Sequence, residues 1–150
     1  MLRGRLDSPY RYLEDVAMAD AAFVVSGDTL KEVFTDSAKA VSNTMVEDLA
    51  SVSRITEREV KIRSDNLEYL LFDFLQTLVY YKDAEKLLFS AFEINISHQR
   101  DDYVLEAKIF GEEIDSQKHR LSADVKAVTM HKFKLEKKRG AWNGMVVLDT

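Results

Sequence analysis

The chain has 150 residues, of which 46% are hydrophobic, and this size suits one domain, 1–150, with a buried core. Cysteine is absent, which excludes disulfides, thiol nucleophiles and cysteine-type zinc sites and fits a reducing, cytoplasmic setting. The net charge of −5 argues against a free-standing nucleic-acid binder, which usually presents a basic face.

The sequence shows no membrane or secretion signal. No apolar run reaches the roughly 18 residues that a spanning helix needs. The first residues lack the apolar region of a signal peptide, and residues 1–8 are expected to form a loose, disordered leader.

The first half of the chain predicts a strand and a helix. Tyr10–Gly27 is strand-like at both ends, and its apolar run Ala21–Val25 indicates a buried strand. A helix is expected from Leu30 to about Asp48, because apolar residues recur there at intervals of three and four. Asp28 or Thr29 would be its N-cap.

A second strand and helix follow. Arg54–Ser64 alternates apolar and charged residues, as in a strand with one solvated face. The next helix is expected to be capped by Ser64 or Asp65, with Glu68 placed for a capping box. Its wide apolar stripe predicts burial in the core and comprises Leu67, Leu70, Leu71, Phe74, Leu75 and Leu78.

The second half reads as hairpins, because the apolar period changes to two. Strands are expected at Leu87–His98, Tyr103–Ile114, Ser122–Lys138 and Met145–Asp149, with a hairpin loop at Arg139–Gly144. Two helices and about seven strands predict an α+β fold in which two helices pack on antiparallel β-sheets in a compact sandwich.

Lys126 stands within a strand-like stretch and has two interpretations. Alternation would place Lys126, Val128 and Met130 on one face and His131 on the other. A lysine in a half-exposed strand is usually solvated and opposes edge pairing, and this is the simpler interpretation. Beside paired carboxylates or a phosphate, the same lysine would supply a positive charge.

Two acidic positions are candidates for a site. Asp20 lies in the apolar segment "MADAAF", where it points outward, caps an element or serves a site. Asp149 and the terminal carboxylate of Thr150 would offer several oxygens within a short reach, the donors that hard cations prefer. A frayed polar tail is the simpler alternative. The scattered histidines, among them His119 and His131, show no zinc spacing, and the common nucleotide-binding and hydrolase motifs are absent.

Six pieces of the chain, in order, resemble the archease family. They are "GDTLKEVFTDSAKAV", "DNLEYLLFDFLQTLVYYKDAE", "LLFSAFEI", "FGEEID", "VKAVTMH" and "VVLDT". "FGEEID" matches the family's glycine–glutamate turn, His119 falls where the family has a histidine, and "VKAVTMH" is close to the family's "VKAVTYH". One piece departs: the family's "HTAD" is "AMAD" here, so Ala17 and Met18 replace histidine and threonine while Asp20 is kept.

The resemblance implies a non-enzymatic accessory protein for the GTP-dependent RNA ligase of the RtcB type, which joins RNA ends in tRNA splicing. Archeases help that ligase to form its guanylate on histidine and to turn over repeatedly. By resemblance, Asp20, Asp149 and Thr150 would bind a divalent cation, first of all Ca²⁺, with Mg²⁺ or Mn²⁺ as alternatives. Lys126 would act beside them, with His119 and His131 as candidates for support. Direct contact with nucleic acid or membrane is not expected, and the oligomeric state stays open.

Two other functions compete with this one. The runner-up is a general chaperone-like binding module, in which the acidic residues have no specific role. The weakest is a metal-dependent hydrolase using Asp20 and Asp149, because no nucleophile or general base is visible beside them.

Overall fold

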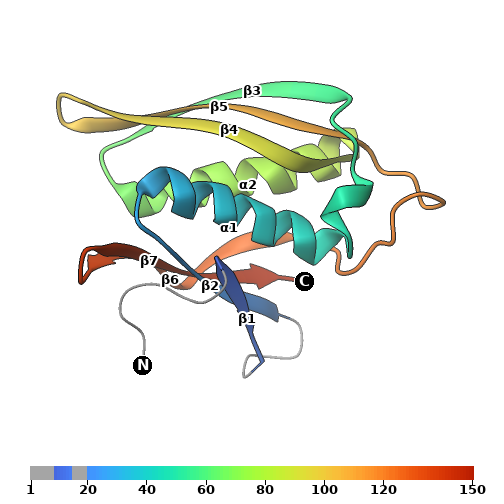
Figure 1. The fold of residues 1–150 in the computed structure, drawn as a ribbon, viewed down its shortest axis with the longest axis horizontal. Helices are drawn as coiled ribbons and strands as arrows, with labels where there is room; N and C mark the ends of the chain where they lie inside the picture. Colours follow the sequence, from blue (N-terminus) through green and yellow to red (C-terminus); the bar gives the residue numbers. More distant parts are fainter. Residues whose placement is uncertain (1–8, 15–19) are drawn as a thin grey trace.

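The computed structural model describes residues 9–14 and 20–150, and its elements form three layers. In chain order they are β1 (Tyr10–Leu13), β2 (Asp20–Gly27), α1 (Leu30–Met45), a 3₁₀ turn (Leu49–Ser51), β3 (Thr56–Ser64), α2 (Leu67–Glu85), β4 (Leu87–Gln99), β5 (Asp102–Glu113), β6 (Ala127–Lys138) and β7 (Ala141–Asp149). One antiparallel sheet has the order β1-β2-β7-β6 and the other β3-β5-β4. Both helices lie between the two sheets (Figure 1), which confirms the predicted α+β sandwich.

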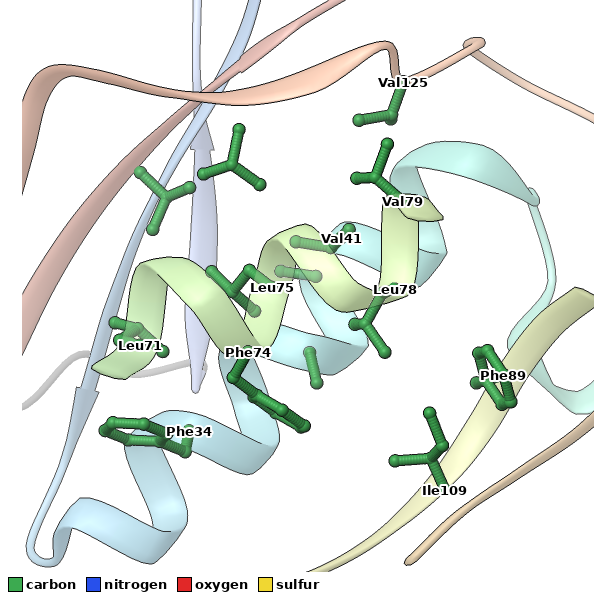
Figure 2. Packing of buried hydrophobic residues seen from close by; sticks show 14 of the residues in the cluster. Phe34, Val41, Leu71, Phe74, Leu75, Leu78, Val79, Phe89, Ile109 and Val125 are labelled. Carbon is green, nitrogen blue, oxygen red and sulfur yellow. The ribbon is translucent and has the colours of Figure 1, made fainter. Parts of the chain in front are cut away.

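The helices form the centre of the core. Phe34 of α1 and Phe74 of α2 are fully buried and stack with their ring centroids 6.4 Å apart (Figure 2). Leu71, Leu75 and Leu78 of the predicted stripe are buried as well. Because a sheet covers the helix pair on each side, α2 is apolar around most of its circumference, as expected of a helix buried in a core. No helix in the part of the chain that the structure describes is long and apolar enough to cross a membrane.

The helix ends confirm one expectation and correct two. Thr29 caps α1 as predicted, since its side chain accepts from the Glu32 N–H at 3.1 Å. Asn66 caps α2 in place of Ser64 or Asp65. The helix α1 ends at Met45 and not near Asp48, because Val46 has an extended backbone and forms an antiparallel β-bridge with Leu121.

The strands confirm one expectation and correct two others. The strand β5 ends at Glu113, within one residue of the predicted Ile114, so "FGEEID" does not form the turn that the family resemblance implied. A Cβ on Gly111 would lie 1.7 Å from the Leu88 carbonyl oxygen, so only glycine fits beside β4 there. The β6–β7 turn is confined to Arg139 and Gly140, whose φ angles are 55° and 81°. Residues 141–144, expected in a loop, therefore belong to β7.

The strand β6 lies at one edge of its sheet, and α2 satisfies part of that edge. The Val128 N–H donates to Gln76 Oε1 and the Leu135 N–H donates to Glu68 Oε2, both at 2.9 Å. Glu68 therefore bonds β6 and does not close the predicted capping box. An edge strand with its N–H groups engaged in this way offers fewer of them to a second chain.

A bulge interrupts β6 between these two contacts. Thr129 lies opposite Val147, but the next paired residue is Lys134, opposite Met145. Phe133 within the bulge packs edge-to-face on Phe72 of α2, with ring centroids 5.6 Å apart. The bulge thus places Phe133 against α2, and the pairing of β6 with β7 resumes at Lys134.

Replacing Gln76 tests the contact between α2 and β6. Gln76→Ala leaves the N–H of Val128, a residue 4% exposed, without its side-chain acceptor. We expect the free energy of unfolding in urea to fall by about 1–3 kcal/mol. Asp73→Ala, on the exposed face of the same helix, is the control and should change it little. Equal losses in both variants would show that the contact contributes nothing.

Candidate functional site

The pairing of β2 with β7 brings two predicted acidic residues together. Asp20 and Asp149 are direct partners in the antiparallel register. Their neighbours Ala21 and Leu148 pack in the core, so alternation directs both carboxylates to the face away from the helices. The Cβ atoms of directly opposed residues lie about 4.5–5.5 Å apart in such pairs. The two carboxylates are therefore neighbours on one face, separated by 129 residues of sequence.

Lys126 joins this pair from the residue just before β6. Ala127 is the partner of Asp149 on β6, and the Lys126 N–H donates to the Asp149 carbonyl oxygen at 2.8 Å. The Lys126 side chain is exposed. Asp20, Lys126, Asp149 and the adjoining Thr150 thus lie at one end of the four-stranded sheet, where the C-terminus is seen in Figure 1. We call these four residues the acidic end.

The electrostatics of the acidic end favour a positive partner. Like charges directly opposite each other on paired strands destabilise the pair. A cation close to both carboxylates removes that repulsion. The atoms that Asp20, Asp149 and Thr150 could offer to a metal are all oxygens, which suit a hard divalent cation. Among residues 9–14 and 20–150, no three His, Asp or Glu side chains are arranged to hold a metal, so a cation here would also need oxygens of Thr150.

The predicted alternation around Lys126 is wrong. Lys126 is exposed whereas Val128 is 4% exposed and faces the core. The reason is that the regular strand begins at Ala127, five residues later than expected, so the chain does not alternate across residues 122–126. The bulge after Thr129 then carries His131 into an exposed position on the edge strand.

His119 belongs to a buried network near the end of β5. Its Nε2 lies 2.9 Å from Glu112 Oε2, and its Nδ1 accepts from the Asp115 N–H at 3.0 Å. Because Nδ1 is an acceptor, Nε2 carries the proton and donates it to Glu112. His119 is 2% exposed. Its contacts therefore fix the loop after β5, and its predicted support of the acidic end stays a prediction, as does that of His131.

Glu112 gathers three donors from separate segments. Its Oε2 accepts from Lys118 Nζ at 2.6 Å, from the Ser53 N–H at 2.7 Å and from His119. These hydrogen bonds, that of Lys118 first, lower the pKa of Glu112 to about 2 against the opposing effect of burial. The network joins β5, the segment before β3 and the loop that leads towards Lys126.

Sequence reasoning missed the ionic contacts behind the acidic end. Lys82 of α2 is buried and bonds the segment that precedes β6. The available signal was a lysine that follows the apolar residues of "LVYYKDAE". Its partner Asp83 is adjacent, but Asp124 and Val125 lie more than 40 residues away. Ala17 and Met18, which replace the family's histidine and threonine, lie outside the described residues, as does the predicted leader 1–8.

The chain is an α+β sandwich with two helices between antiparallel sheets and two opposed acidic residues at one sheet end. Comparison with known proteins shows the family to which such a chain belongs. The archease protein family model matches residues 10–150. The archease of Methanosarcina mazei is 37% identical over 141 residues, covering 93% of this chain and 94% of its own. That of Pyrococcus furiosus is 34% identical over 132 residues, covering 87% and 92%. The chain belongs to the archease family.

Solved structures agree with this assignment. The solution structure of Methanobacterium thermoautotrophicum protein 1598 matches with a TM-score of 0.82 at 33% identity, covering 99% of this chain and 100% of that one. A crystal structure of a Thermotoga maritima archease, described as a possible chaperone, matches with a TM-score of 0.58 at 18% identity. It covers 89% and 93% of the two chains and shows the shared fold alone.

The lowered pKa of Glu112 predicts how stability depends on pH. Its ionised form is stabilised in the folded protein, so its contribution is complete above the ordinary value near 4.5 and is lost as the pH falls towards about 2. We expect Glu112→Gln to lower the free energy of unfolding at neutral pH. The gap from wild type should narrow as the pH falls from about 4.5 to about 2.

Urea unfolding at several pH values measures this gap. Glu113→Gln, at the exposed neighbouring position, is the matched control and should show a small, unchanging difference. A gap for Glu112→Gln that stays constant from neutral to acid pH would show that the network does not depend on the ionised carboxylate.

Proposed function

We propose that this chain activates a GTP-dependent RNA ligase of the RtcB type, promoting guanylylation of the ligase and its repeated turnover. The observation that carries the proposal is the placement of Asp20 directly opposite Asp149, with Lys126 held beside Asp149. Membership of the archease family supports it. The chain itself would catalyse no reaction and would work by binding the ligase.

The acidic end would be the part that contacts the ligase. It presents concentrated negative charge, which is complementary to the basic surfaces of proteins that handle RNA. The net charge of −5 favours the same kind of partner over direct binding of RNA. If the acidic end binds the GTP-accepting conformation of the ligase more tightly than other conformations, it shifts the ligase towards that state.

A divalent cation fits the acidic end, first of all Ca²⁺, with Mg²⁺ or Mn²⁺ as alternatives. Asp20, Asp149 and oxygens of Thr150 would hold it. When bound, the ion would supply positive charge that offsets the repulsion between the carboxylates. Lys126 would provide a fixed positive charge at the same end of the sheet, and its exposed side chain would reach the ligase.

A general chaperone-like module is the second candidate. The Thermotoga maritima relative is described as a possible chaperone. Some large apolar side chains are exposed here, among them Ile55 at 75% and Tyr80 at 59%, and such groups can contact unfolded clients. This function predicts protection of unrelated proteins from aggregation, with equal effect in wild type and Asp20→Asn.

Thermal unfolding tests whether the acidic end binds a cation. Ca²⁺ at about 100 times its Kd should stabilise wild type by about 2.7 kcal/mol. Asp20→Asn and Asp149→Asn should lose this response, and in chelator each should be more stable than wild type by about 0.2–1 kcal/mol. Asp101→Asn, at the exposed β4–β5 turn, is the control and should respond like wild type. A full response in the two acidic-end variants would place the cation elsewhere.

Ligation with the cognate ligase tests the function. In excess RNA over ligase, wild type should restore repeated turnover, whereas Asp20→Asn, Asp149→Asn and Lys126→Met should lose at least tenfold in stimulation. The control Lys108→Met, exposed on the three-stranded sheet, should act like wild type. The proposal fails if wild type gives no stimulation or if all variants stimulate equally.

A further inference from the structure

Lys82 is a buried charged residue outside the acidic end. It lies in the last turn of α2, and its side chain is 8% exposed. Its Nζ donates to Asp124 Oδ1 at 2.5 Å and to the Val125 carbonyl oxygen at 2.6 Å, and lies 2.8 Å from Asp83 Oδ1. An ammonium group has three donors, and each here has an oxygen nearby. A buried cation is tolerated only when it is paired in this way.

The carboxylates around Lys82 favour its charged form. Burial alone lowers the pKa of Lys82, but the hydrogen bonds to Asp124 and Asp83 outweigh it and raise the pKa above its ordinary value. The hydrogen bond from Lys82 is the largest cause of the lowered pKa of Asp124. Both carboxylate side chains are well exposed, at 73% and 60%, so solvent weakens these ion pairs. The buried bond to the Val125 carbonyl is the contact that solvent screens least.

The segment that Lys82 holds leads directly into the acidic end. Val125 is fully buried, and its side chain lies next to Val79, one turn before Lys82 on α2 (Figure 2). The following N–H, that of Lys126, donates to the Asp149 carbonyl oxygen. Lys82 therefore binds one side of this peptide segment and Asp149 binds the other.

The sheet alone does not place Lys126. Regular pairing of β6 with β7 begins one residue later, at Ala127. Before that point the N–H groups of Ser122 and Ala123 bond the end of α1. From Asp124 onward the path is set by the contacts of residues 124–126 with α2 and Asp149.

We propose that Lys82 is a positioning residue that fixes Lys126 at the acidic end. Its ammonium group bonds the Asp124 carboxylate and the Val125 carbonyl to α2. These bonds place the Lys126 N–H so that it can donate to the Asp149 carbonyl oxygen. The effect on the ligase rests on the proposed function of the acidic end. The effect on the position of Lys126 is independent of that function and can be measured in the chain without the ligase.

Amide hydrogen exchange of the whole chain tests the positioning. Lys82→Met keeps the unbranched stem and removes the ammonium group. We expect the Lys126 amide to exchange at least tenfold faster, while the Val128 amide, which is bonded to Gln76, changes less than twofold. Asp83→Asn, which removes the partner outside the 124–126 segment, is the control and should leave the Lys126 amide unchanged.

A second variant keeps the test possible if Lys82→Met does not fold. Asp124→Asn alters an exposed side chain and leaves the bond to the Val125 carbonyl in place. It should raise exchange of the Lys126 amide about threefold, because one of the two ties to Lys82 is weakened. Unchanged exchange at Lys126 in the folded variants would overturn the proposal.

Ligation separates this proposal from the function on which it rests. If wild type stimulates the ligase, Lys82→Met should lose stimulation to the level of Lys126→Met, and the double variant should be no worse than Lys126→Met alone. Full stimulation by Lys82→Met despite fast exchange would overturn the functional part of the proposal. If wild type gives no stimulation, the ligase function fails, and the exchange measurement still decides whether Lys82 positions Lys126.

Discussion

The register between β2 and β7 is the constraint on which the acidic end depends. Phe23 lies opposite Val146, and both are fully buried against the helices. A slip of one residue would turn every side chain of one strand to the opposite face and expose these groups to water. Core burial therefore forces Asp20 to lie opposite Asp149 even though their charges repel. The acidic end is therefore a consequence of the packing beneath it, and we propose that the repulsion between its carboxylates is offset by a bound cation.

The helix α2 links that packing to the end of the sheet. Its apolar residues fill the centre of the molecule, while three of its polar side chains bond the chain at and before β6. Glu68 and Gln76 engage N–H groups of the edge strand, and Lys82 engages the segment that leads into it. The helix thus sets where β6 and the segment before it run, and that segment brings Lys126 to Asp149.

Local patterns in the sequence were enough to predict the layers and both helices. The predicted stripe from Leu67 to Leu78 packs as expected, because helical spacing reports directly on burial. Asp20, Lys126 and Asp149 were candidates from the sequence, and the resemblance favoured them over simpler interpretations. The strand register and the Lys126 bond to Asp149 bring them together. The patterns could not show that β6 begins at Ala127 or bulges after Thr129, since the contacts of this strand with α2 join residues far apart in the sequence. The role of Lys82 was hidden for the same reason.

The central claim is that the acidic end is the surface that meets the ligase. Hydrogen–deuterium exchange of the chain, alone and bound to the ligase with GTP, tests it most directly. The account predicts slower exchange in the peptides that contain Asp20, Lys126 and Asp149, with no change on β3 of the opposite sheet. Protection confined to the three-stranded sheet, with the acidic end exchanging as in the unbound chain, would contradict the account.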